Sequence, residues 1–124
     1  MKRITTGSPF ETALAFSRAV VKGDWCFVSG VTGYDYATMT MPAGAADQAR
    51  NCFATIGRAL DEAGFSMSDV VRVQYTVTDP ALVDEVAAEF RAALGGVAPA
   101  ATIIVAGLIR PEMLIEIEVT AFRG

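Results

Sequence analysis

The chain has 124 residues, 52% hydrophobic and only 19% charged, with a formal net charge of −4 and no histidine. This length fits one domain of residues 1–124, and so few charges on so apolar a chain favour a homo-oligomer that buries part of its surface between subunits. The acidic balance without a basic run argues against nucleic acid as a partner, and the absence of histidine argues against a zinc site or a Ser-His-Asp triad.

Nothing in the sequence directs the chain to a membrane. The first residues lack the apolar core and cleavage site of a secretion signal, and no stretch reaches the roughly 18 apolar residues of a membrane span. We therefore expect a cytoplasmic protein with no membrane partner. In that compartment Cys26 and Cys52, which lack CxxC spacing, are expected to be reduced thiols in the core.

The first third of the chain is predicted to consist mostly of strands. Residues 2–6 and 17–22 have strand composition, and a turn at 22–24 leads into a further strand at 25–29. A short Gly-containing turn between two such strands predicts an antiparallel hairpin. Residues 33–44, which contain Gly, Asp and Pro, are predicted to form a loop.

Two amphipathic helices are predicted in the middle of the chain. Apolar residues from 45 to 63 recur on one helical stripe, and Gly64 follows as a residue able to end the helix. Gly57 interrupts this stripe at a cost of roughly 1 kcal/mol relative to Ala, so close approach of another backbone is expected there. Residues 71–77 alternate apolar and polar side chains as a half-buried strand does. A second helix is predicted over 79–94, with an Asp N-cap, Pro in its first turn and two glycines after it.

Two apolar strands close the chain. Residues 97–108 and 113–122 are joined by a short Pro-containing turn, and Glu116 and Glu118 lie two positions apart in the second strand. Side chains alternate between the faces of a strand, so both carboxylates point to one face. The order of strands, helix, strand, helix and two strands predicts an α+β fold in which a mixed sheet carries both helices on one face.

Several stretches, taken in order and spacing, resemble the reactive intermediate deaminase (RidA) family. The resemblance covers nearly the whole chain and rests on Phe16–Val20, Gly23–Gly30, Ala63–Val71, Val77–Asp79 and Val97–Phe122. It implies a chorismate-mutase-like fold and a homotrimer with ligand clefts between neighbouring subunits. It also implies that water hydrolyses a 2-imino or enamine acid to a 2-oxo acid and ammonia, without metal or organic cofactor.

The resemblance also implies a small substrate site. Glu116 is expected to handle the attacking water or the leaving ammonia, and Ser29 and Gly30 are expected to contribute hydroxyl and backbone contacts to the ligand. Three further site positions, where the family often has tyrosine, asparagine and cysteine, are occupied here by Phe16, Ala87 and Ile103.

The family's substrate-binding arginine is missing, because Ala101 occupies its position. An arginine grips a carboxylate through two parallel hydrogen bonds, which a methyl group cannot replace. This departure makes the chain an atypical member and favours a neutral or cationic compound over the usual 2-imino acid. Arg18 and Arg110 are alternative sources of a positive charge.

Two interpretations of Glu116 remain open. In an apolar cleft, desolvation would raise its pKa and make it a general acid or base; otherwise it is a partly solvated carboxylate bonded to backbone N–H groups or to a neighbouring subunit's arginine. Glu118 is expected to be solvated or at an interface. We therefore predict a homotrimer that binds a small metabolite and hydrolyses an imine, an enamine or a related compound. The alternative is a noncatalytic ligand-binding or protein-interaction trimer.

Overall fold

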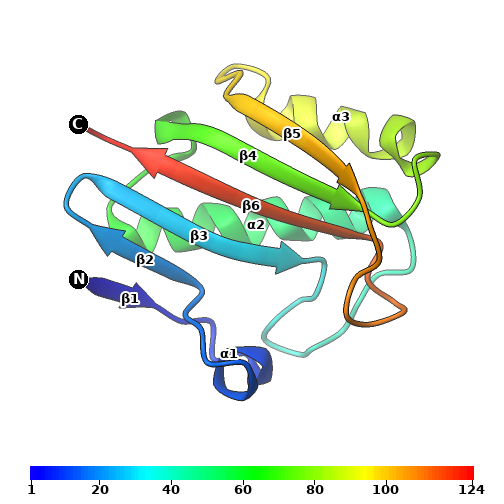
Figure 1. Cartoon of the computed structure of the whole chain (residues 1–124), viewed down its shortest axis with the longest axis horizontal. Coiled ribbons are helices and arrows are strands. Elements are labelled where there is room, and N and C mark those ends of the chain that lie inside the picture. The colour runs from blue at the N-terminus through cyan, green and yellow to red at the C-terminus, as the bar shows by residue number, and fades with distance from the viewer.

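The computed structural model describes residues 1–124, which form one six-stranded sheet and three helices (Figure 1). A short 3-10 turn precedes β4. In chain order the elements are β1 (Lys2–Ile4), α1 (Pro9–Ala13), β2 (Ala19–Lys22), β3 (Trp25–Thr32), α2 (Ala45–Ala63), the 3-10 turn (Met67–Asp69), β4 (Val70–Val77), α3 (Leu82–Leu94), β5 (Ala100–Val105) and β6 (Ile115–Phe122).

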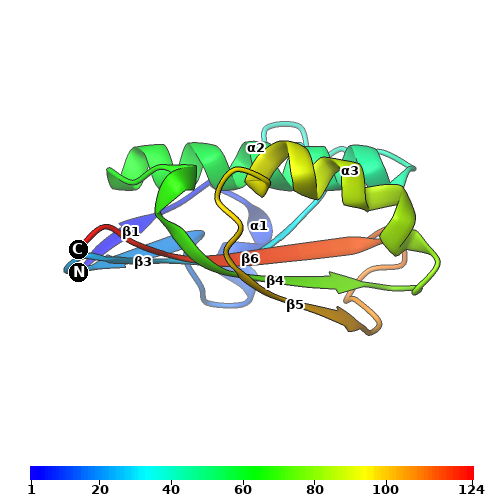
Figure 2. The same cartoon turned by 90° about the horizontal axis from the view of Figure 1, so that it is seen from above.

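The strands lie in the order β1-β2-β3-β6-β4-β5, so the last strand in the chain is central in the sheet. β4 and β5 are parallel and are joined through α3, whereas every other neighbouring pair is antiparallel. The two long helices, α2 and α3, cover the same face of the sheet (Figure 2). The predicted α+β architecture, a mixed sheet with two helices on one face, is confirmed.

The hydrophobic core lies between the sheet and these two helices. In β6, Ile115 and Ile117 are fully buried towards the helices, whereas Glu116 and Glu118 alternate with them and point to the other face. The apolar stripe of α2 packs on the buried side. Its buried members are Ala45, Ala49, Cys52, Phe53, Ile56, Ala59, Leu60 and Ala63. Both cysteines, Cys26 and Cys52, are free and lie in this core as predicted.

The first long helix matches its sequence signals at both ends. α2 spans the predicted residues 45–63, and Gly64 follows with a φ of 82°, a left-handed conformation that glycine adopts without steric cost. The Phe65 N–H then donates to the Leu60 carbonyl at 2.8 Å and closes the helix. The expectation of a close backbone approach at Gly57 was wrong, because a Cβ added there meets no atom within 4 Å.

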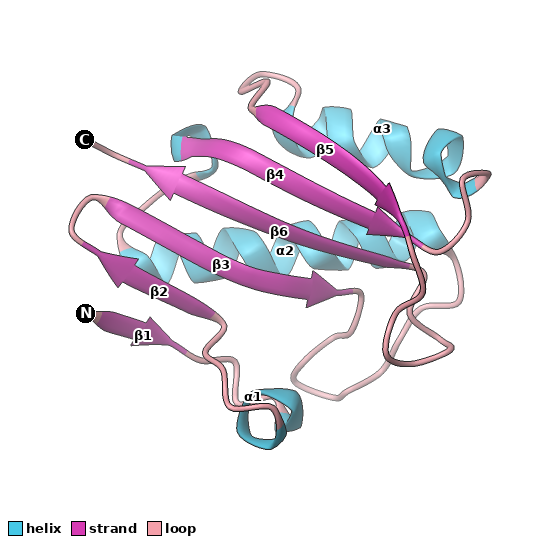
Figure 3. Cartoon of the chain, viewed as in Figure 1, coloured by secondary structure: helices cyan, strands magenta, loops and turns pink.

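Two local features differ from the predictions. α3 begins at Leu82 rather than at residue 79, because Asp79 Oδ1 accepts the Ala81 N–H at 2.8 Å and closes a turn before the helix. The five-residue helix α1 was not predicted (Figure 3). Ser8 Oγ caps it by accepting the Phe10 N–H at 3.2 Å, and a helix this short shows no apolar period in the sequence.

The other face of the sheet carries no helix. Trp25 and Phe27 are 43% and 49% exposed there. The Trp25 ring centroid lies 4.5 Å from that of Phe122 and 6.2 Å from that of Phe27, so the three rings form one exposed aromatic cluster. The edge strand β5 is exposed along its whole length. None of the helices has the length and apolar character needed to cross a membrane.

Candidate functional site

A bulge in β3 forms the floor of the candidate site. The pairing of β3 with β6 shifts register around Ser29 and Gly30. Two hydrogen bonds hold the bulge: the Ser29 N–H donates to the Arg18 carbonyl at 2.9 Å, and Ser29 Oγ donates to the Ser17 carbonyl at 2.7 Å. Such bulges redirect side chains and are frequent beside functional sites.

Glu116 packs on this bulge. It pairs in register with Thr32 of β3 and points away from the helices. A Cβ added to Gly30 would lie 2.6 Å from Glu116 Cδ, so the lack of a side chain at residue 30 leaves room for the carboxyl group. Partial burial raises the pKa of Glu116, the Glu118 carboxylate raises it further, and Arg18 partly opposes both effects.

The environment of Glu116 is the desolvated one of the two considered above. No hydrogen bond from the chain to its carboxylate contributes to its pKa, which is dominated by burial. Glu118, two residues further on, is exposed. Glu116 is therefore the carboxyl group on this face whose protonation state the fold controls.

A cavity of about 320 Å³ opens over Glu116. It brings together four residues predicted from the sequence, namely Phe16, Ser29, Gly30 and Glu116. The remaining lining residues are Phe10, Leu14, Arg18, Thr32, Tyr36, Ile109 and Met113. Most of these were missed because they come from α1, the loop after β3 and the β5–β6 connection, which only the folded chain brings together. Six of the eleven lining residues are hydrophobic, so the cavity can exclude water from a ligand.

Arg18 is enclosed beside this cavity and is only 1% exposed. Its Nη1 donates to the Gly30 carbonyl at 2.8 Å and, more weakly, to the Ser29 carbonyl at 3.4 Å. The guanidinium carbon lies 5.5 Å from the Phe16 ring centroid and 5.1 Å from that of Tyr36. Arg18 forms no ion pair within 4.0 Å, and its buried Nε has no hydrogen-bond partner.

The structure does not bring Ala101 and Ile103 to this cavity within one chain. They pair in register with Val73 and Tyr75 of β4, whose side chains are buried on the helix side of the sheet. On the Glu116 side, β5 instead presents residues 100, 102 and 104, and Thr102 accepts a hydrogen bond from Arg72 at 3.2 Å. A role for residues 101 and 103 in ligand binding therefore stays a prediction that requires a second copy of the chain.

Ala87 and Arg110 also lie outside the cavity lining. Ala87 is on α3, which covers the opposite face of the sheet from Glu116. The Arg110 guanidinium lies 5.7 Å from the Phe10 ring centroid, on the surface side of that ring. Of the two arginines considered as substitutes for the missing cation, only Arg18 lines the cavity.

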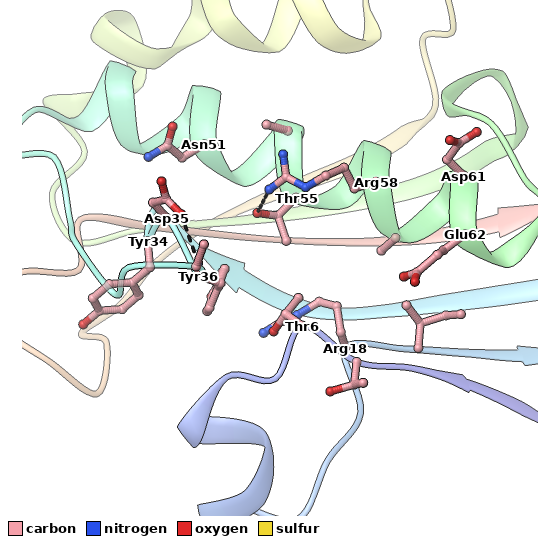
Figure 4. A pocket seen from close by; sticks show the side chains of 15 residues that line it. Thr6, Arg18, Tyr34, Asp35, Tyr36, Asn51, Thr55, Arg58, Asp61 and Glu62 are labelled. Atoms are coloured by element: carbon pink, nitrogen blue, oxygen red, sulfur yellow. Dashed lines mark hydrogen bonds between the residues drawn. The ribbon is translucent and has the colours of Figure 1, made fainter.

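A second, larger cavity lies on the helix side of the sheet, between α2 and the segment that follows β1 (Figure 4). Its volume is about 740 Å³, and it shares Arg18 and Tyr36 with the first cavity. Arg58 of α2 also lines it and donates to Thr55 Oγ1 at 3.4 Å. Arg18 therefore separates two cavities on opposite sides of the sheet.

The chemistry available over Glu116 is acid–base chemistry and hydrogen bonding. No group of three or more Cys, Asp or Glu side chains is placed to hold a metal ion. Burial raises the pKa of Cys52, whose Sγ donates to the Val31 carbonyl at 3.2 Å, and Ser29 Oγ donates to a backbone carbonyl. Neither group is activated as a nucleophile.

Comparison with known proteins identifies the family. The family model described as Endoribonuclease L-PSP matches residues 6–123, almost the whole chain. The chain belongs to the RidA (YjgF/UK114) family. The predicted membership is confirmed, while the substrate and the activity are not given by it.

Individual RidA-family proteins agree with this assignment over their full lengths. The crystal structure of Rv2704 from Mycobacterium tuberculosis, a member of the YjgF/YER057c/UK114 family, has 34% sequence identity and a TM-score of 0.90 over 98% of both chains. RidA from the Antarctic bacterium Psychrobacter has 26% identity and a TM-score of 0.84, covering 98% of this chain and 94% of that one. The uncharacterised protein SCO2049 of Streptomyces coelicolor is 30% identical over 125 residues, which cover 100% of this chain and 93% of the relative.

Proposed function

We propose that this RidA-family protein is a cofactor-independent hydrolase that acts on an imine, supplied directly or by its enamine tautomer, with Glu116 as the acid–base residue. The observation that supports it is the partly buried Glu116 carboxyl, which rests on Gly30 and faces a largely apolar cavity. Because its pKa is raised, this carboxyl exchanges protons at a higher pH than an ordinary glutamate does.

The proposed reaction returns Glu116 to its starting state. Ionised Glu116 accepts a proton from water while the water oxygen bonds to the imine carbon, and the C=N electron pair becomes a nitrogen lone pair that takes this proton. In the resulting carbinolamine the C–N bond breaks as nitrogen takes a second proton and leaves as ammonia. The hydroxyl group loses its proton and becomes the carbonyl.

The proposal includes a homotrimer in which a neighbouring copy completes the cavity. The exposed aromatic cluster of Trp25, Phe27 and Phe122 and the exposed strand β5 form an apolar surface of the kind that subunit contacts bury. A second copy is also the means by which residues of β5 or α3 would reach the cavity over Glu116. The number three comes from the family resemblance.

Ammonia release from an imine generated in the assay tests the proposal, with Glu118→Gln as the matched control for Glu116→Gln. Both substitutions remove one carboxylate from the same face of β6, but only Glu116 lines the cavity. We expect Glu116→Gln to lower the rate above the uncatalysed background by about 100-fold or more, and Glu118→Gln to keep the wild-type rate at neutral pH. Equal rates for wild type and Glu116→Gln would remove Glu116 from the mechanism.

The second candidate is a noncatalytic trimer that binds a small metabolite in the same cavity. The mostly apolar lining and the absence of a second proton-transfer group beside Glu116 favour it over any activity on RNA, which the net charge of −4 also disfavours. A metabolite that raises the melting temperature without being converted would support this function instead.

A further inference from the structure

Arg18 is the one arginine of the chain that the fold encloses. A buried cation is costly unless hydrogen-bond acceptors or an anion replace its lost hydration. A guanidinium carries five N–H donors, yet the chain provides acceptors only at Nη1, from the carbonyls of Ser29 and Gly30. Nε is buried without a partner, and Nη2 donates to no group of the chain. Two of its three nitrogens are left without an acceptor.

The neighbouring acids do not supply the missing anion. The Glu11 carboxylate is already bonded, since it accepts hydrogen bonds from Thr5 Oγ1 at 2.6 Å and from the Thr6 N–H at 3.0 Å. Glu116 shares the cavity with Arg18 but is not within 4.0 Å of it, because the ion pairs of the chain involve only Arg50. Arg18 therefore keeps an uncompensated positive charge next to an open volume.

We propose that Arg18 is the anion anchor of the Glu116 cavity and binds a carboxylate of the ligand. The inference rests on the proposed function only for placing the reacting bond beside Glu116. The planar guanidinium matches a carboxylate in a two-bond arrangement, and its orientation is set by the Ser29 and Gly30 carbonyls and by the Phe16 and Tyr36 rings.

The distribution of charge favours this cavity over the second one. The larger cavity of Figure 4 also reaches Arg18, but Asp35, Asp61 and Glu62 line it and would repel an anion. The first cavity contains a single carboxyl, that of Glu116, and burial there favours its neutral form. An anion bound to Arg18 consequently meets less repulsion on the Glu116 side of the sheet.

This assignment changes the substrate class expected for the protein. The alanine at residue 101 favoured a neutral or cationic compound, on the assumption that the missing cation was not replaced. Arg18 supplies a positive charge from the segment before β2 of the same chain, on the cavity's own wall. The expected substrate is therefore an imine that carries a carboxylate, held by Arg18 while Glu116 handles the protons.

Equilibrium binding measures this anchor without any turnover. The probes are 4-methyl-2-oxopentanoate and its neutral amide, which differ in charge but share an apolar tail suited to the cavity. We expect titration calorimetry to show the acid binding wild type about tenfold or more tightly than the amide, and added NaCl to weaken only the acid. Arg18→Gln should lose this preference, and Arg18→Lys should restore part of it. Arg58→Gln is the control, because Arg58 lines only the second cavity.

The outcomes separate this inference from the proposed function. Equal affinity of wild type for acid and amide, or no binding of either, overturns the anchor, and the wild-type comparison holds even where an Arg18 variant does not fold. Loss of acid binding in Arg58→Gln would also overturn it by placing the anion in the second cavity. Acid binding that depends on Arg18 in a protein that hydrolyses no imine would leave the anchor standing while the proposed function fails.

Discussion

The Glu116 carboxyl group occupies the space where any residue other than glycine at position 30 would place its side chain. An added Cβ on Gly30 would lie 2.6 Å from Glu116 Cδ and 2.8 Å from Oε1. Gly30 is in the bulge of β3, so the strand irregularity and the placement of the carboxyl group are one feature.

Gly30→Ala should therefore displace the Glu116 carboxyl. We expect a loss of about 1–3 kcal/mol in the free energy of unfolding, or a comparable loss of turnover if the side chain moves instead. Gly96→Ala is the control, because a Cβ there meets no atom within 4 Å. Urea unfolding and ammonia release measure the two effects, and a Gly30→Ala protein with wild-type values of both would contradict the packing described.

Glu118→Gln should move the pH profile of hydrolysis. The Glu118 carboxylate raises the pKa of Glu116, so its removal lowers that pKa. If ionised Glu116 is the base, the acidic limb of kcat/KM shifts to lower pH while the rate above the limb stays unchanged. Glu62→Gln, which removes a carboxylate from α2, should leave the limb in place. A limb that stays fixed in Glu118→Gln would show that another group controls it.

Glu116→Gln should stabilise the fold at neutral pH relative to acidic pH. The folded-state pKa of Glu116 lies above its unfolded value, so its favourable contribution is present below the unfolded pKa and is lost as the pH rises through the folded pKa. Glutamine does not ionise, so the stability of the variant relative to wild type should increase across that interval. Urea midpoints measured from about pH 4 to pH 7 test this, and a difference that does not change with pH would contradict the raised pKa.

Gly57→Ala should stabilise α2. The site is inside the helix with open space around the added methyl group, so we expect a gain of about 0.5–1 kcal/mol and a melting temperature about 2–4 °C higher. Gly64→Ala is the opposite case, because φ is 82° there and alanine is strained, which should cost about 1 kcal/mol. Thermal unfolding followed by circular dichroism compares the two, and the same sign for both would refute the argument.

Phe27→Asp should dissociate the proposed oligomer. A charge in the exposed aromatic cluster would have to be buried without a partner on association. Light scattering should give a trimeric mass for wild type and a monomeric mass for the variant. Ala92→Asp adds the same charge to an exposed position of α3 and should leave the mass unchanged. A monomeric wild type would contradict the subunit contact on this face.

The elements that could be predicted from the sequence are those with a clear period. The stripe of α2 and the alternation in β6 come from burial of one face, which leaves a regular trace over many residues. α1 and the first turn of α3 depend on single side-chain hydrogen bonds, from Ser8 and Asp79, which compete with other local arrangements. Such short elements leave no comparable pattern.

The candidate site could be predicted in part. Glu116, Ser29 and Gly30 meet as the family motifs implied, but the strand face of residue 101 could not be known, because a shift of one residue along a strand reverses the face. The burial of Arg18 was equally hidden, since arginine side chains are mostly exposed and only the tertiary structure encloses this one.

The central position of β6 has a consequence for synthesis of the protein. Since β6 is made after all the other strands, β3 and β4 have no common partner while a ribosome is still translating the preceding residues. The β2–β3 hairpin and the β4–α3–β5 unit would wait as separate pieces with unpaired strand edges, a state that chaperones protect from aggregation. A nascent chain stalled before residue 115 should therefore expose two sticky fragments instead of a smaller folded protein.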